Sequence, residues 1–249
     1  MNRTDPFDGI LLVDKPTDHT SHDVVARIRG RFQLKKVGHG GTLDPSATGL
    51  LIILLGRGTS VSNRFMSSDK TYEGTLRLGI TTDSQDADGQ IIKESDPSGI
   101  SRDQLESAMA QFKGDMFQTP PMVSAIKIKG VPLYKMALRG QEIERKPRFI
   151  HIYNFRLLDY TSPCGIFVLR CSKGTYVRTL CHDVGEALGV GAHLKGLRRT
   201  ETAGFDVKQA IPLDALLAMS QTDLLNVVLP LHSLTVNQPD SCSPSESLA

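Results

Sequence analysis

The chain has 249 residues, 39% of them hydrophobic, and a formal net charge of +2. This length allows one large domain or two small ones with a substantial core. Its apolar runs fall short of the ~20 residues that a membrane-spanning helix needs, and the polar N-terminus carries no secretory signal pattern. The four cysteines form no Cys-x-x-Cys pair, which argues against a zinc site. These features predict a cytoplasmic protein with reduced thiols and no membrane partner.

The N-terminal elements alternate between short apolar segments and one amphipathic stretch. Residues Gly9 to Asp14 predict a strand, which Pro16 ends because proline restricts the residue before it to extended backbone. Ser21 is expected to cap a helix over residues 22–32, where apolar residues recur at helical spacing. The apolar run from Leu50 to Leu55 predicts a buried strand.

The middle of the chain carries the clearest start and stop signals. Residues Thr71 to Gly79 predict a strand, and Gln90 to Lys93 a return strand. Ser101 and Gln104 form a capping box, which predicts a helix beginning there. Gly114 is expected to end that helix.

The C-terminal half predicts a hairpin followed by helices. The strands are expected over Arg148–Tyr160 and Gly165–Ser172, a helix over Thr179–Leu188, and a helix in at least two pieces over Leu213–Leu229. Because strands and helices mix without regular βαβ alternation, we expect an α+β fold with a mixed, mostly antiparallel sheet flanked by helices. The Ser/Pro-rich residues 234–249 are expected to be disordered.

Basic residues are segregated along the chain. Residues 24–43 contain five Lys or Arg and no acid, and residues 119–156 contain eight Lys or Arg and two acids. Such segregation favours a polyanionic ligand on one face. A solvated charged surface, which many proteins have, is the alternative interpretation.

The stretch from Gly38 to Gly49 is the strongest candidate for chemistry. It contains four glycines and a single carboxylate, Asp44, followed by Pro45. Glycine permits close approach of a large ligand, and proline fixes the chain after the acid, so Asp44 is a candidate nucleophile. An ordinary Asp-Pro turn is the alternative. A nucleotide-binding P-loop is disfavoured because Gly-Lys followed by Ser or Thr is missing.

Five segments in this order and spacing resemble the bacterial tRNA pseudouridine synthase B family, whose members modify uridine 55 of the tRNA T-loop. The segments are Leu11–Pro16, Gly38–Pro45, Lys70–Tyr72, Cys171–Thr179 and Gly191–Arg199. The resemblance runs from about residue 9 to 233. It implies one catalytic domain with the pseudouridine synthase fold, a thumb-like insertion at about residues 119–147, and an isomerase that needs no cofactor or metal. Its implied partner is the T-arm of tRNA, bound by a monomer without a protein partner.

The resemblance implies catalytic roles for three residues. Asp44 matches the catalytic aspartate, which attacks either C1′ of the ribose or C6 of the base. Arg178 matches the arginine that pairs with this aspartate, so we expect the pKa of Asp44 to stay low. Tyr72 matches a tyrosine whose ring stacks on the flipped uracil and whose hydroxyl is a candidate base for the C5 proton.

Five further residues match positions that support or contact the substrate. His39 matches a histidine that enters the T-loop beside the extruded base. Tyr176 and Leu197 match residues that line the uracil pocket. Lys15 belongs to an early motif taken to support the catalytic loop and is counted with the substrate-binding residues. Lys127 and other basic residues of the insertion would meet phosphates.

The chain departs from the family pattern at several places. Val123 stands where the family usually has Tyr or Phe, Asp18 replaces a glycine, and Gly40 replaces a threonine. Asp tolerates left-handed backbone better than most residues, so Asp18 is expected to keep the turn. Only a short tail follows Ser233, so we expect the C-terminal RNA-binding PUA domain of many members to be absent.

Two other functions fit parts of the sequence. An RNA-binding protein or tRNA folding chaperone could use the same scaffold without catalysis. A metal-dependent hydrolase could be built on His19, His22 and Asp44, although His19 is expected to precede the helix and no third ligand follows at a known spacing.

Overall fold

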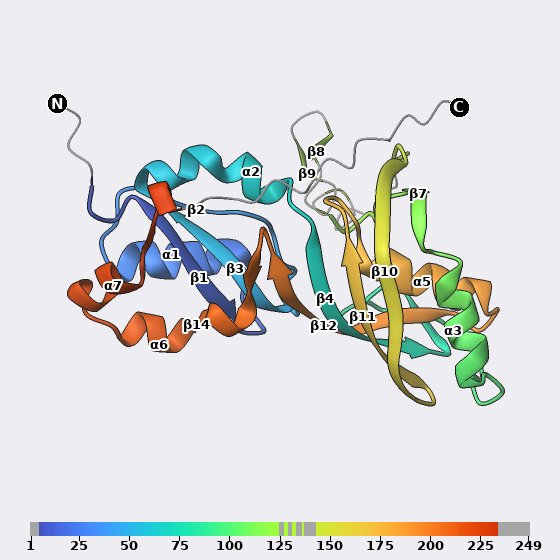
Figure 1. Cartoon of the computed structure of the whole chain (residues 1–249). Coiled ribbons are helices and arrows are strands. Elements are labelled where there is room, and N and C mark those ends of the chain that lie inside the picture. Colours follow the sequence, from blue (N-terminus) through green and yellow to red (C-terminus); the bar gives the residue numbers. More distant parts are fainter. Residues whose placement is uncertain (1–4, 125–126, 129–130, 133–135, 137–142, 234–249) are drawn as a thin grey trace, which may run out of the picture.

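A computed structural model describes residues 5–124, 127–128, 131–132, 136 and 143–233 of the chain. Among these residues, eleven strands form one mixed sheet (Figure 1). Its main path runs β14 (Ile211–Pro212), β1 (Gly9–Lys15), β3 (Thr48–Leu55), β12 (Ala192–Thr202), β4 (Lys70–Leu78), β11 (Cys164–Cys171), β10 (Arg148–Thr161) and β7 (Gly114–Gln118). Three short strands pair beside it: β2 (Val37–His39), β13 (Phe205–Asp206) and β15 (Leu229–Pro230).

The pairs β1–β14 and β3–β12 are parallel, and the other pairs of this sheet are antiparallel, as the sequence predicted. Two smaller sheets join β5 (Ile80–Thr82) to β6 (Ile91–Glu94) and β8 (Lys127–Ile128) to β9 (Val131–Pro132). The helices are α1 (Ser21–Arg31), α2 (Ser62–Met66), α3 (Arg102–Ala110), α5 (Val177–Ala187), α6 (Leu213–Ala218) and α7 (Gln221–Val227). Short 3₁₀ helices cover Gly56–Val61, Val207–Gln209 and Leu231–Ser233.

Strand β3 is buried on both faces, which confirms the prediction from its apolar run. Side chains on one face of β3 (Leu51, Ile53 and Leu55) pack against α1 in the main core, and alternate residues of β1 pack there too. Side chains on the other face pack with Phe65 of α2 in a second cluster. Because both faces of this strand are covered, its sequence lacks the polar alternation of a half-exposed strand.

The other half of the sheet is covered on one face only. Buried residues alternate with more exposed ones along β11 and most of β4. Figure 1 shows α3 and α5 on one side of β10 and β11, while the opposite side of these strands carries no helix. This half therefore has one core face and one face toward solvent.

Two helix boundaries differ from the sequence prediction. Thr20, not Ser21, caps α1, and it forms a capping box with Asp23. The Ser21 hydroxyl instead exchanges hydrogen bonds with the backbone N and O of Leu43, at 2.8 and 3.2 Å. The capping box of Ser101 and Gln104 is confirmed, but α3 ends at Ala110 and Gly114 opens β7 with a φ of +93°.

The helical C-terminal segment forms two pieces, α6 and α7, as predicted. No helix in the described parts of the chain combines the length and apolar character that a bilayer crossing requires. The tail at residues 234–249 and much of the insertion lie outside the described residues.

Candidate active site

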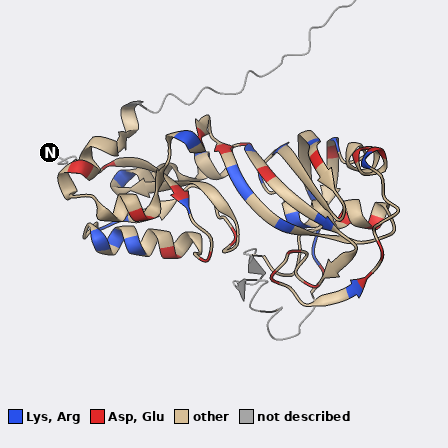
Figure 2. Cartoon of the chain, turned by 90° about the horizontal axis from the view of Figure 1, so that it is seen from below, with Lys and Arg blue, Asp and Glu red and all other residues tan. Residues whose placement is uncertain are grey.

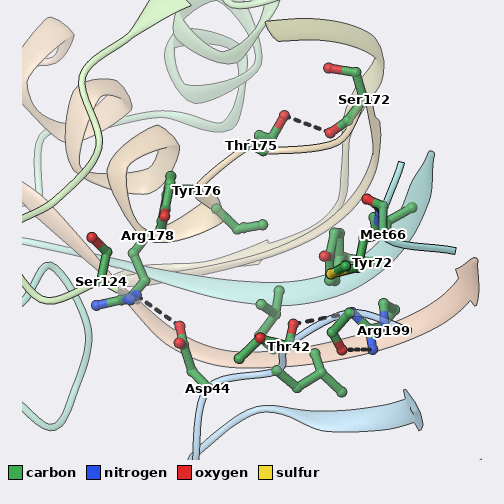
Figure 3. A pocket seen from close by; sticks show the side chains of 16 residues that line it. Thr42, Asp44, Met66, Tyr72, Ser124, Ser172, Thr175, Tyr176, Arg178 and Arg199 are labelled. Atoms are coloured by element: carbon green, nitrogen blue, oxygen red, sulfur yellow. Dashed lines mark hydrogen bonds and ion pairs between the residues drawn. The ribbon is translucent and has the colours of Figure 1, made fainter. Parts of the chain in front are cut away.

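A cleft of about 280 Å³ opens where the loop before β3 meets β4, β12 and the start of α5. Figure 3 shows the side chains that line it. They come from five separate segments: residues 41–44, 66–72, 124, 172–178 and 197–199. Its volume is near the lower end of the range for small-molecule sites, so it suits a group the size of one nucleobase with its sugar.

Asp44 and Arg178 meet in this cleft. The Nε atom of Arg178 lies 2.9 Å from Oδ2 of Asp44 (Figure 3). The Arg178 side chain is buried, whereas the Asp44 side chain keeps 41% of its surface exposed. The buried partner therefore holds a carboxylate that still faces the open cleft. Asp44, Arg178 and Tyr72, which the resemblance assigned to catalysis, all line this one cleft.

Arg178 also joins two other segments, residues 84–86 and residue 123. Its Nη1 atom lies 3.3 Å from Oδ2 of Asp86 and donates to the Ser84 carbonyl at 3.2 Å. Its Nη2 atom donates to the Val123 carbonyl at 2.9 Å. Sequence reasoning did not find Asp86, because it stands in a polar loop rich in acids whose contact with α5 exists only in the folded chain. Two carboxylates thus share one guanidinium.

The expected low pKa of Asp44 is not what the structure gives. Burial in the cleft raises the pKa of the Asp44 carboxyl above 3.8, and the Asp86 charge adds to the rise. The Arg178 guanidinium and the Lys15 ammonium oppose it. The sequence expectation counted the attraction of the arginine and missed the cost of removing the carboxylate from water.

Tyr72 and Arg199 form the inner wall of the cleft. Tyr72 is buried, and burial raises its pKa to about 12 while the neighbouring Arg199 guanidinium lowers it. A phenol with this pKa is protonated at neutral pH, so Tyr72 is a hydrogen-bond donor in the free protein. Arg199 is fully buried, and its guanidinium donates to the carbonyls of Leu50, Gly41 and Thr42 at 2.7, 3.2 and 3.3 Å.

The loop that carries Asp44 is held from beneath by Lys15. This side chain is completely buried, and its Nζ atom donates to the carbonyls of Pro16, His19 and Pro45 at 2.8, 2.7 and 3.1 Å. Burial lowers the pKa of Lys15 to about 8. Lys15 therefore supports the loop, as its motif suggested, from a position with no exposed surface, and contact between this residue and a substrate stays a prediction.

His39 lies outside the cleft, in a groove beside it. This groove is lined by residues of α1, β2 and α2, and Met66 borders both hollows. The Nδ1 atom of His39 accepts a hydrogen bond from the Gly41 backbone at 3.4 Å. Burial lowers the pKa of the imidazole, so it is neutral at neutral pH. The groove also contains the basic side chains of Arg29 and Lys36.

The remaining predicted residues divide into two groups. Tyr176 and Leu197 line the cleft, and their contact with uracil stays a prediction. Lys127 starts β8, but its side chain and residues Lys129, Lys135 and Arg139 lie outside what the structure describes. The structure therefore leaves the phosphate contacts of the insertion as a prediction.

Two departures from the family pattern have local explanations. Asp18 has a φ of 61°, the left-handed conformation in which glycine is the usual residue. A Cβ atom on Gly40 would lie 2.6 Å from the Cβ of Phe65. A threonine at position 40 would therefore require Phe65 to move.

Within the described residues, no group of three or more His, Cys, Asp or Glu side chains is placed to hold a metal ion. His19, His22 and Asp44 do not form such a group. The Nδ1 atom of His19 instead bonds to the Thr17 carbonyl at 2.9 Å.

Comparisons with known proteins define the class of the chain as a pseudouridylate synthase. The family model of the TruB family pseudouridylate synthase N-terminal domain matches residues 29–177, and that of the tRNA pseudouridylate synthase B C-terminal domain matches residues 178–235. The first match includes Asp44 and Tyr72, and the second includes Arg178 and Arg199. Residues from both matched regions therefore line the cleft. The chain belongs to the TruB family.

Individual relatives agree with this assignment. A tRNA pseudouridine synthase B of Opitutus terrae is 52% identical over 226 residues, which cover 91% of this chain and 94% of that protein. The tRNA pseudouridine synthase B of Syntrophotalea carbinolica is 50% identical over 90% of this chain and 74% of that protein. Among solved structures, a Cbf5–Nop10–Gar1 complex contains a similar chain, with a TM-score of 0.73 and 29% identity. The match covers 92% of this chain but 61% of that chain, less than two thirds of its length.

Proposed function

We propose that the protein converts uridine 55 in the T-loop of tRNA to pseudouridine. The observation that carries this proposal is the ion pair of Asp44 and Arg178, 2.9 Å long, in a cleft that also contains Tyr72. Membership in the TruB family supports the reaction, and relatives named tRNA pseudouridine synthase B support tRNA as the substrate.

Asp44 is the proposed nucleophile. An enzyme that acts on a stacked base must first take it out of the stack, and the cleft has room for one such nucleotide. Asp44 then attacks C1′ of the ribose or C6 of the base. The glycosidic bond at N1 breaks, the uracil turns, C5 bonds to C1′, and the bond between Asp44 and the substrate breaks, which frees the carboxylate. The C5 proton leaves and N1 gains a proton, so the product is an isomer and nothing is oxidised.

The other cleft residues have supporting roles in this proposal. Arg178 holds Asp44 in place and limits the rise of its pKa. The Tyr72 ring stacks on the extruded base. Its hydroxyl, beside the Arg199 guanidinium, is protonated in the free protein, so it is the candidate acceptor of the C5 proton once it has given its own proton to N1. Tyr176 and Leu197 enclose the base. Asp86 acts through Arg178 and is therefore a positioning residue.

The T-arm lies across the basic surface beside the cleft in this proposal. Lys and Arg positions gather along α1 (Figure 2), and the groove next to the cleft contains Arg29, Lys36 and His39. Such contacts position the RNA backbone without reading sequence. The insertion, with Lys127, would add phosphate contacts. We propose that the protein works as a monomer in the cytoplasm, where its substrate is found.

A direct test uses an unmodified tRNA transcript carrying tritium at uracil C5. Purified protein, without added metal, should release label from one T-loop uridine in each tRNA. A full reaction in excess chelator would argue against the metal-dependent hydrolase. Tight tRNA binding without tritium release would contradict the proposal and favour the RNA chaperone.

A further inference from the structure

The solvent side of β7 and β10 carries two large rings that the core does not use. Phe117 is 71% exposed and Phe149 is 60% exposed. Among the described residues, Phe117 is the most exposed of the large hydrophobic side chains. The two residues lie directly opposite in the β7–β10 register, with ring centroids 5.8 Å apart in an edge-to-face arrangement. Adjacent exposed rings of this size often mark an interaction site.

The rings continue along the same face as a stripe. Phe149, His151 and Tyr153 alternate along β10, so their side chains share one side of the sheet. The rings of His151 and Tyr153 are 4.4 Å apart, and the Arg170 guanidinium of β11 lies 5.1 Å from the Tyr153 ring. We call Phe117, Phe149, His151, Tyr153 and Arg170 the aromatic stripe.

The charges around the stripe favour a polyanion over an apolar partner. Arg170 and Lys173 are exposed beside it. Its nearest acids already have partners: Asp115 contacts the His151 ring at 2.5 Å, and Asp69 lies 4.0 Å from Arg170. Exposed rings on a sheet, with cations at their edge, are the arrangement with which proteins stack unpaired RNA bases and neutralise the phosphates.

The stripe is also continuous with the cleft. Ser172, which lines the cleft, accepts a hydrogen bond from the His151 backbone N at 2.8 Å and donates from its own backbone N to the His151 carbonyl at 2.9 Å. An RNA strand leaving the rim at Ser172 would therefore meet the stripe next.

From these observations we propose that the aromatic stripe is a second RNA-binding site, which stacks unpaired nucleotides of a single strand on Phe117 and Phe149 while the cleft remains free. This site goes beyond the proposed modification of uridine 55, because it binds RNA without acting on it.

The test measures binding of a fluorescein-labelled oligouridylate to the full chain by fluorescence anisotropy. The protein is first saturated with an unlabelled T-arm stem-loop, so that the cleft is occupied. The double variant Phe117→Leu, Phe149→Leu keeps apolar side chains that suit a strand but removes the ring faces. We expect its affinity for the oligonucleotide to fall about tenfold or more, while tritium release from the isolated stem-loop stays at the wild-type rate.

Matched controls separate this proposal from a fold defect and from the proposed function. Ile91→Ala with Ile92→Ala removes side chains that are 55% and 65% exposed on β6, and it should leave oligonucleotide binding unchanged. Thermal melts check that the leucine variant is folded, and Phe149→Tyr should retain binding because it retains a ring. Asp44→Asn should bind the oligonucleotide as tightly as the wild type, whether or not the cleft of the wild type makes pseudouridine. Equal oligonucleotide affinity of the wild type and the folded leucine variant would overturn the proposal. So would wild-type protein that does not bind the oligonucleotide and instead self-associates through this face.

Discussion

The carboxylate of Asp44 and the guanidinium of Arg178 form a 2.9 Å ion pair between a glycine-rich loop and the first turn of α5. The arginine is buried and the carboxylate faces the cleft. Because Asp86 contacts the same guanidinium, loss of Asp44 would not leave Arg178 as an unpaired buried charge. The pair therefore allows chemistry and folding to be tested separately.

Asp44→Asn should abolish tritium release and leave tRNA affinity close to wild type. Since burial raises the pKa of Asp44, the ionised carboxylate opposes folding at neutral pH, and the neutral amide should not lower the melting temperature. Filter binding, tritium release and thermal melts measure the three effects. Residual release at a rate near wild type would show that another group is the nucleophile.

Arg178→Met should destabilise the protein, because it leaves two carboxylates and two carbonyls without their shared donor. Breaking a buried ion pair in this way typically costs about 3–5 kcal/mol in the free energy of unfolding. Urea denaturation measures the loss. The free energy of unfolding of Arg178→Lys should lie between those of Arg178→Met and the wild type. A methionine variant within about 1 kcal/mol of wild type would contradict this account of the guanidinium.

Lys15 should give the protein a distinctive alkaline response. Its pKa falls from 10.5 to about 8 in the folded state, so between these pH values the unfolded chain holds the extra proton. Stability therefore rises with pH across this window, by on the order of 3 kcal/mol for this group. Urea denaturation of wild type and Lys15→Met from pH 7 to 10.5 should show that the free energy of unfolding of the wild type rises with pH relative to that of the variant. Parallel curves would indicate that the lysine titrates normally.

Lys36→Ala tests the groove beside the cleft. The removal of one phosphate contact should weaken binding to all tRNAs alike and lower the slope of log affinity against log salt by about one. Lys93→Ala, an exposed lysine on β6 away from the groove, is the matched control. Equal salt slopes for the two variants would show that Lys36 makes no phosphate contact and that RNA does not bind along the groove.

Local sequence signals predicted much of the fold because they depend on neighbours in the chain. The apolar run of β3 and the capping box of Ser101 and Gln104 are of this kind, and both are confirmed. Ser21 shows the limit of such signals. Either of two adjacent hydroxyl residues, Thr20 and Ser21, could cap α1. In the structure Thr20 is the cap and Ser21 bonds to Leu43, a contact between distant parts of the chain that local spacing does not reveal.

The sequence by itself identified Asp44, Tyr72 and Arg178 as candidates, because the family pattern preserves their order and spacing. Only the tertiary structure decided that these residues line one cleft, that Asp86 shares the arginine, and that Lys15 lies buried beneath the loop. It also decided that the pKa of Asp44 rises. The physical reason is that desolvation and ion pairing depend on distances between atoms from distant parts of the chain, and those distances exist only after the sheet and α5 have assembled.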